Sequence, residues 1–165
     1  MASMHKRRVV VTGIGIVAPN GTTVDTFWDS LCAGKSAAGK LTRFEPKGMP
    51  CRLACEVNDF SFEEYVDPKK INRLDRSLLF AISAAKKSLT DSQLNLNKIS
   101  ADRIGVVEGT SVSGLDNTLK SHERFLEIGY KAIKPSNLVT AFCGGGSSEI
   151  AIALGIQGQA TTICL

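Results

Sequence analysis

Continuous runs of apolar and β-branched residues occur at three places in the chain, within 8–17, 102–112 and 160–165. Such runs are typical of strands covered on both faces in a parallel sheet, because neither face then needs polar side chains. A shorter segment, 52–57, is a further candidate strand. The pattern therefore predicts a buried sheet at the centre of the protein.

Segments with apolar residues at helical spacing lie between these runs. The first is 22–34, which Thr22 or Thr23 can cap and which Gly34 can end. One face of this predicted helix carries Val24, Phe27, Trp28, Leu31 and Cys32. The spacing predicts that this face is buried.

The clearest helical pattern covers 75–94. Its predicted buried stripe consists of Leu78, Leu79, Ile82, Ala85 and Leu89. A third helix is predicted over 113–129, with Ser113 or Asp116 at its start and Gly129 at its end.

The remaining segments are shorter or less regular. An apolar helix between glycines is predicted over 144–158. Segment 60–66 is a candidate short helix that Pro68 ends, and 134–142 is expected to be a loop.

The order of these elements predicts the fold class. Strands alternate with helices, which is typical of an α/β layered fold with a mixed, mainly parallel sheet. The sequence shows no repeat and no low-complexity linker, so we predict one domain over 1–165. Within it, residues 1–5 are expected to be disordered or tag-derived.

Composition narrows the functional classes. The net charge of +4 suits an acidic partner, but it is too small and too scattered to predict nucleic-acid binding. No signal peptide and no apolar run of transmembrane length occurs, so we expect a cytoplasmic protein with no membrane contact. The odd set of five cysteines contains no CxxC, and with two histidines it predicts neither a metal site nor any other cofactor.

Two glycine-rich turns could bind a ligand. "GIGIVA" at 13–18 is similar to a dinucleotide fingerprint, but the turn Pro19-Asn20-Gly21 follows where a helix should begin. A dinucleotide-binding domain therefore stays a minor alternative. "GTSVSG" at 109–114 lacks the lysine of a phosphate loop and is better explained as a pocket wall at the end of a strand.

Three kinds of side chain could act in catalysis. Ser147 or Ser148 with Glu149 suits the cap of a helix, and His122 lies in a run typical of a solvated helix face. Cys164 is a weak candidate nucleophile, because a reactive cysteine needs a helix N-terminus or an imidazole to lower its pKa. We therefore expect Cys164 to be a buried, inert cysteine on a strand.

Four segments together resemble the N-terminal portion of a β-ketoacyl-[acyl carrier protein] synthase, a condensing enzyme of fatty-acid and polyketide synthesis. They are "RRVVVTGIGIVAPNGTTVDTFWDSLCAGKS", "INRLDRSLLFAISAAKKSL", "RIGVVEGTSVSG" and "AIALGIQGQATTIC", and they follow one another in the family's order. The resemblance implies a thiolase-like fold of five layers, α-β-α-β-α, and a dimeric enzyme.

The resemblance also implies a chemistry. The family's cysteine takes an acyl group from a carrier thioester, and two histidines then assist condensation with a malonyl carrier protein. Counted from Gly158, the position of that cysteine falls just beyond Leu165, and neither His5 nor His122 matches a catalytic histidine. We therefore expect a truncated or split synthase without condensing activity of its own.

The resemblance implies a role in the acyl pocket for only three residues of this chain. Val112 matches a position that lines the acyl chain, and Asn137 with Leu138 matches a loop that reaches the partner's pocket in the dimer. Asn137 departs from the more apolar residue of relatives. The implied partners are an acyl carrier protein and either a second copy of the chain or a complementary C-terminal half. A non-catalytic module that binds a carrier protein or a synthase stays open as an alternative.

Overall fold

A parallel pair of strands, β3 (Val106–Thr110) and β4 (Ala160–Cys164), forms the centre of the computed structural model. The register runs from Val106 opposite Ala160 to Thr110 opposite Cys164. The structure describes residues 8–135, 137 and 141–165, so the prediction for 1–5 lies outside it. Both predicted strands are confirmed, and their parallel pairing agrees with the predicted fold class.

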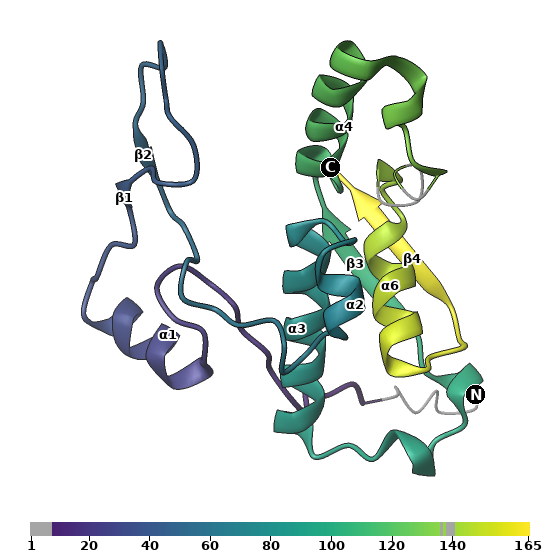
Figure 1. The fold of residues 1–165 in the computed structure, drawn as a ribbon. Helices are drawn as coiled ribbons and strands as arrows, with labels where there is room; N and C mark the ends of the chain where they lie inside the picture. Colours follow the sequence, from purple (N-terminus) through teal and green to yellow (C-terminus); the bar gives the residue numbers. More distant parts are fainter. Residues whose placement is uncertain (1–7, 136, 138–140) are drawn as a thin grey trace, which may run out of the picture.

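Two helices cover one face of this pair. Helix α6 (Gly145–Leu154) packs against β3, β4 and α3 (Arg76–Ser92), as Figure 1 shows. The hydrophobic core between these elements consists of Phe62, Val66, Leu79, Ile82, Val106, Ile150 and Ala151. Apolar side chains from distant parts of the sequence thus meet between the helices and the strands.

Helix α3 follows its sequence pattern closely. The Asp75 side chain caps it by accepting a hydrogen bond from the Ser77 amide at 2.9 Å. Leu78 and Ile82 are each 1% exposed, which confirms the predicted stripe. Asp75 also accepts a hydrogen bond from the Asn117 amide at 3.2 Å and so joins α3 to the helix that follows β3.

Helix α4 (Leu115–Ile128) follows β3 and continues into the 3-10 helix η3 (Gly129–Ala132). The predicted stop at Gly129 is confirmed, since its φ of 71° is a conformation that favours glycine. The predicted caps Ser113 and Asp116 are wrong. The cap position is Gly114, which lets the chain turn with a φ of 69° and provides no side chain.

An arm made of α1 (Val24–Cys32), β1 (Gly39–Lys40) and β2 (Leu53–Ala54) stands apart from this body in Figure 1. β1 and β2 pair antiparallel, so the candidate strand at 52–57 is confirmed over two residues. Thr23 caps α1 through a capping box, as predicted. The predicted burial of its apolar face is wrong, because no residue of α1 is buried and Trp28 is 63% exposed.

Two other expectations near the N-terminus are wrong. Residues 8–17 form no strand, and Val9 is 93% exposed, because no described strand lies beside this segment to pair with it. Segment 60–66 forms turns and no helix. Helix α2 (Pro68–Ile71) begins where a stop was expected, because proline suits the first helical position and Asp67 caps it.

The connections complete the chain. The 3-10 helices η1 (Leu96–Lys98) and η2 (Ala101–Arg103) lead from α3 to β3. In the segment 134–142, expected to be a loop, Pro135 and Asn137 are helical. Within the described ranges, no helix is long and apolar enough to cross a membrane.

Candidate functional site

A network of polar side chains joins β3, β4 and the first turn of α6. The Thr162 hydroxyl donates to Glu108 Oε2 at 3.1 Å and lies 2.8 Å from the Ser147 hydroxyl. Ser147 is 2% exposed, so its hydroxyl depends on these protein partners. The network holds the first turn of α6 against the middle of the strand pair.

Gly146 makes room for this network. A Cβ at this position would overlap the carboxylate of Glu108. The expectation that Ser147 or Ser148 caps α6 is wrong, because Gly144 takes the cap position and Ser147 bonds to Thr162 instead. Glu149 forms an ion pair with Lys70 of α2 at 3.2 Å. Sequence reasoning missed Glu108, although a lone acid in an apolar strand is a signal that could have revealed it.

Cys164 closes β4 opposite Thr110. Its side chain is exposed, so the expectation of a buried cysteine is wrong. Local desolvation of the thiol raises the pKa of Cys164, and a hydrogen bond with Cys143, the charge of a Cys143 thiolate and the charge of Glu108 raise it further. A raised pKa disfavours the thiolate, which is the opposite of what a cysteine nucleophile requires.

The three predicted pocket residues are not brought into one described site. Val112 is 57% exposed in the bend between β3 and α4. Asn137 donates to the Ser121 hydroxyl at 2.6 Å and lines two cavities on α4, neither of which Val112 lines. Leu138 lies outside the described residues. Their role in an acyl pocket therefore stays a prediction.

The larger of the two cavities on α4 has a volume of about 500 Å³ and a basic lining. Its wall consists of Asn72, Arg73, Asn117, Lys120, Ser121, Arg124, Ala132, Lys134 and Asn137. Lys120 is paired with Asp116 at 2.7 Å, whereas no ion pair with a described residue involves Arg73, Arg124 or Lys134. These cations are distant in sequence and meet through α4 and η3, which is why charge patterning along the chain did not reveal them.

The second cavity, of about 350 Å³, is mainly apolar and includes Phe125, Ile133 and His122. His122 is exposed on α4, which agrees with the expected solvated helix face, and it also lines this cavity. Among the described residues no group of three or more His, Cys, Asp or Glu side chains is arranged to hold a metal.

The glycines of "GIGIVA" serve a different purpose from a dinucleotide loop. A Cβ on Gly15 would overlap the backbone of Ala84 in α3, so the glycine allows this segment to pass against the helix. Ile14 donates its amide to Asp91 at 2.8 Å. Helix α1 starts at Val24, after a turn at 18–21, and presents no N-terminus directly after Gly15.

Comparison with known proteins agrees with this architecture. The model of the "Beta-ketoacyl synthase, N-terminal domain" family matches residues 6–164. A 3-oxoacyl-[acyl-carrier-protein] synthase 2 of Synechocystis sp. is 35% identical over 96% of this chain and 38% of its own length. A synthase of the same name from Coxiella burnetii is 34% identical over 97% of this chain and 39% of its own length.

Solved structures give the same result. The ishigamide ketosynthase/chain length factor superposes with a TM-score of 0.87 at 29% identity, over 96% of this chain and 40% of that one. A β-ketoacyl synthase from Burkholderia phymatum has a TM-score of 0.75 at 22% identity, over 93% of this chain and 38% of that one. A type II ketosynthase solved in complex with its acyl-carrier protein, AntDE:AntF, also has a TM-score of 0.75, at 19% identity.

The parallel strand pair, with α3 and α6 on one face, therefore belongs to the thiolase-like class of layered α/β folds. Within that class, the chain belongs to the β-ketoacyl synthase family and corresponds to its N-terminal domain. It spans less than two fifths of the length of the curated relatives given above. The predicted fold class and family resemblance are both confirmed.

Proposed function

We propose that the chain serves as the N-terminal part of a β-ketoacyl synthase of fatty-acid or polyketide biosynthesis. The reaction of that class is acyl transfer from a carrier thioester, followed by decarboxylative condensation. The observation that carries this proposal is the family match over residues 6–164. The names of the relatives, synthases acting on acyl-carrier-protein substrates, support it.

We further propose that these 165 residues do not catalyse condensation by themselves. None of the groups that shift the pKa of Cys164 is a histidine, and the shift is away from the reactive thiolate. We expect no covalent acyl adduct when the protein is incubated with an acyl carrier thioester and its intact mass is measured. Alkylation of Cys164 by iodoacetamide is the control that shows an accessible thiol. A stoichiometric acyl group on Cys164 would contradict the proposal.

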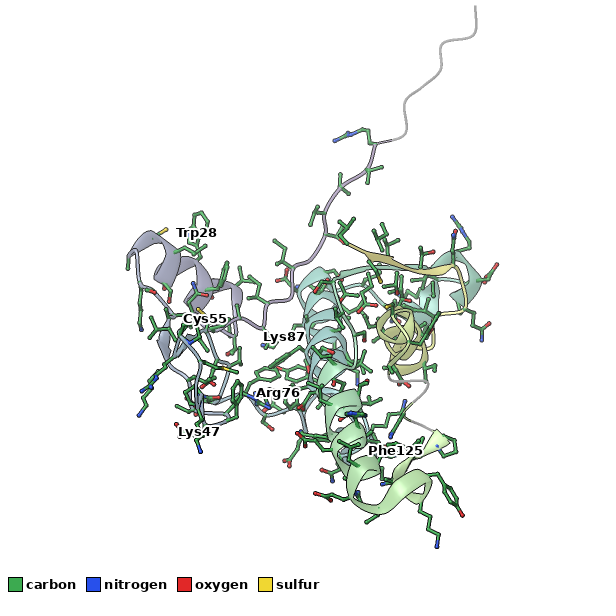
Figure 2. The ribbon with its side chains drawn as sticks, turned by 90° about the horizontal axis from the view of Figure 1, so that it is seen from above. Trp28, Lys47, Cys55, Arg76, Lys87 and Phe125 are labelled. Atoms are coloured by element: carbon green, nitrogen blue, oxygen red, sulfur yellow. The ribbon has the colours of Figure 1, made fainter. Side chains whose placement is uncertain are left out.

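The basic cavity supports an acyl carrier protein as partner, because clustered cations attract an acidic surface. We expect Arg124→Glu to weaken binding of an acyl carrier protein about tenfold or more in titration calorimetry, and added salt to weaken it as well. Lys47→Glu is the matched control, since Lys47 lies on the arm, on the other side of the molecule from Phe125 and α4 (Figure 2). Equal losses for both variants would show attraction by net charge and no docking at the cavity.

The alternative of a non-catalytic binding module rests on the same cavity. One experiment distinguishes the binding module from the synthase. Binding of a carrier protein without acyl transfer favours the module, whereas acyl transfer favours the enzyme. A dinucleotide-binding domain has no comparable support, since Gly13 and Gly15 are packed against α3. Adding the protein should therefore leave the fluorescence of NADH unchanged.

Val112, Asn137 and Leu138 remain the proposed acyl-pocket residues. The exposure of Val112, 57%, leaves it accessible to a ligand. We expect Val112→Asp to weaken binding of a fluorescent fatty-acyl probe, whereas Val107→Asp, on the strand before it, leaves binding unchanged. Equal effects of the two substitutions would contradict a pocket role for Val112.

Exposed apolar side chains support assembly with a second copy or with a complementary C-terminal half. Val107 is 77% and Ile163 51% exposed on the central strands, although such residues are usually covered. A clean, monodisperse monomer in sedimentation would contradict this. We place the protein in the cytoplasm, where its five free cysteines would remain reduced.

A further inference from the structure

The arm that carries α1, β1 and β2 is joined to the rest of the molecule, the body, by two stretches of chain. It leaves the body after Thr22, next to the cap of α1, and it returns at Val57, after β2. Among the described residues, none of those that form the hydrophobic core or pack against it lies between Thr22 and Val57. The hydrophobic core therefore does not fix the orientation of the arm, and the contacts at its two ends are left to do so.

Each end of the arm is held by one cation of α3. The Lys87 ammonium donates to the Thr22 carbonyl oxygen at 2.6 Å, and the Arg76 guanidinium donates to the Val57 carbonyl oxygen. In the described part of the chain, no other hydrogen bond or ion pair joins residues 22–57 to α3 or to a later element. Arg76 and Lys87 are eleven residues, about three helical turns, apart, so they lie on one face of α3 about 16 Å from each other. Figure 2 shows both on the side of α3 that faces the arm.

Three aromatic rings just after the arm connect the two cations. Phe60 and Tyr65 stack with their ring centres 5.6 Å apart. The Lys87 ammonium lies 5.4 Å from the ring centre of Tyr65 and 5.7 Å from that of Phe60. The Arg76 guanidinium lies 5.3 Å from the ring centre of Phe62, which contacts Phe60 edge to face. Each cation is therefore held in place by aromatic rings while it binds a carbonyl at one end of the arm.

We propose that Arg76 and Lys87 form a two-point clamp that sets the orientation of the arm on the body. When one contact is lost, the arm turns as a unit about the end that is still held. A cavity of about 440 Å³ beside Lys87 leaves room for this motion, and it is lined by Thr23 and Asp25 of the arm and by Tyr65 of the body, among others. This inference goes beyond the proposed function and does not rest on it.

Trp28 can report on the clamp. It is the only tryptophan of the chain, it lies on α1, and it is 63% exposed. Figure 2 shows it on the arm, away from α3. The test is time-resolved fluorescence anisotropy of the full chain. We expect the parent protein to decay mainly with the tumbling of the whole molecule. In Lys87→Met we expect a faster component with at least about twice the amplitude found in the parent, because the entry of the arm is released.

Two further variants make the test specific. Lys86→Met removes the same charge from the neighbouring position, about 100° away around the helix, and should leave the decay unchanged. Arg76→Met should add a faster component as Lys87→Met does, because it releases the exit of the arm. An unchanged decay in either Lys87→Met or Arg76→Met would overturn the proposal, and so would an equal change in Lys86→Met.

Hydrogen exchange inside the arm distinguishes turning from unfolding. The Leu41 amide donates to the Arg52 carbonyl oxygen at 2.9 Å within the hairpin. If the arm turns as a unit, the exchange rate of this amide should stay within about twofold of the parent in both clamp variants, while the emission of Trp28 depolarises faster. Circular dichroism of each variant shows that α3 is intact. Exchange of the Leu41 amide that accelerates about tenfold or more together with the motion of Trp28 would mean that the arm unfolds, which would overturn the proposal.

Discussion

Gly146 and Glu108 share one space, because a Cβ on Gly146 would overlap the Glu108 carboxylate. A glycine at position 146 is therefore required for the Glu108 side chain to occupy its place between β3 and α6. Glu108 in turn accepts a hydrogen bond from Thr162, which contacts Ser147. The first turn of α6 is thus held to both strands by a network that includes the Glu108 carboxylate. This carboxylate fits only because residue 146 has no side chain.

Gly146→Ala should destabilise the protein by about 1–2 kcal/mol, since Glu108 must turn away and its bond to Thr162 breaks. In the background Glu108→Ala the same substitution should stabilise by about 0.5–1 kcal/mol, because alanine is the better helix former. Urea denaturation followed by circular dichroism measures both.

Gly109→Ala serves as the control for these variants, because a Cβ there meets nothing within 4 Å although Glu108 is its neighbour. Its effect should be small in either background. If Gly146→Ala were equally destabilising with and without Glu108, the shared space would not be the cause.

Gly15→Ala should release the segment before α1 from α3. A Cβ on Gly15 would overlap the backbone of Ala84, and a backbone cannot rotate away as a side chain can. The amide of Ile14, which donates to Asp91 at 2.8 Å, should then exchange with solvent about tenfold faster or more. Gly39→Ala, in open space, should leave this exchange rate unchanged. An unchanged rate in Gly15→Ala would show that the segment is held elsewhere.

The sequence predicted those parts of the fold that local pattern determines. Helix α3 was predicted almost to its ends, because its cap Asp75 and its apolar stripe both lie within the helix or next to it. The strand expected at 8–17 was wrong, because a strand exists only with a neighbour, and the sequence of one segment does not supply it. The burial predicted for the apolar face of α1 was wrong for the same reason. The spacing of apolar residues predicts an amphipathic helix but does not show what packs against it.

The candidate site was less predictable still. The contact between Ser147 and Thr162 joins residues separated by a helix and a turn, and the basic cavity gathers Arg73, Arg124 and Lys134 from three segments. The spacing of residues along the chain does not predict such long-range contacts. The family resemblance, by contrast, depended on the order of motifs and was readable at once.

Arg76 should be more important for stability than its charge alone suggests. Its guanidinium lies 4.9 Å from the ring centre of Phe80 and 5.3 Å from that of Phe62, and it donates to the Val57 carbonyl. Figure 2 shows Arg76 on the side of α3 that faces the arm. Arg76→Lys should cost about 1–2 kcal/mol, because lysine keeps the charge but loses the planar group that stacks on the rings.

The control for this substitution is Arg103→Lys, since Arg103 is exposed in η2. Denaturation midpoints of the two variants measure the difference. A loss of similar size in both variants would mean that the contacts of Arg76 with the aromatic rings do not stabilise the protein.

The hairpin of the arm should resist acid through Glu56. Hydrogen bonds to its carboxylate, foremost from the Thr42 hydroxyl, lower the pKa of Glu56 to about 2, despite some desolvation. Further bonds come from the amides of Thr42 and Arg43, each at 3.1 Å. Because the folded pKa lies below the ordinary 4.5, the carboxylate stabilises the hairpin fully above pH 4.5, and this contribution disappears as the pH falls toward 2.

The amide shifts of Thr42 and Arg43 should therefore titrate with a midpoint near 2 in NMR spectra. Glu56→Gln should abolish that titration, whereas Glu45→Gln, on the same hairpin, should leave it in place. A midpoint at or above 4.5 in the parent protein would mean that the carboxylate does not hold these amides in solution.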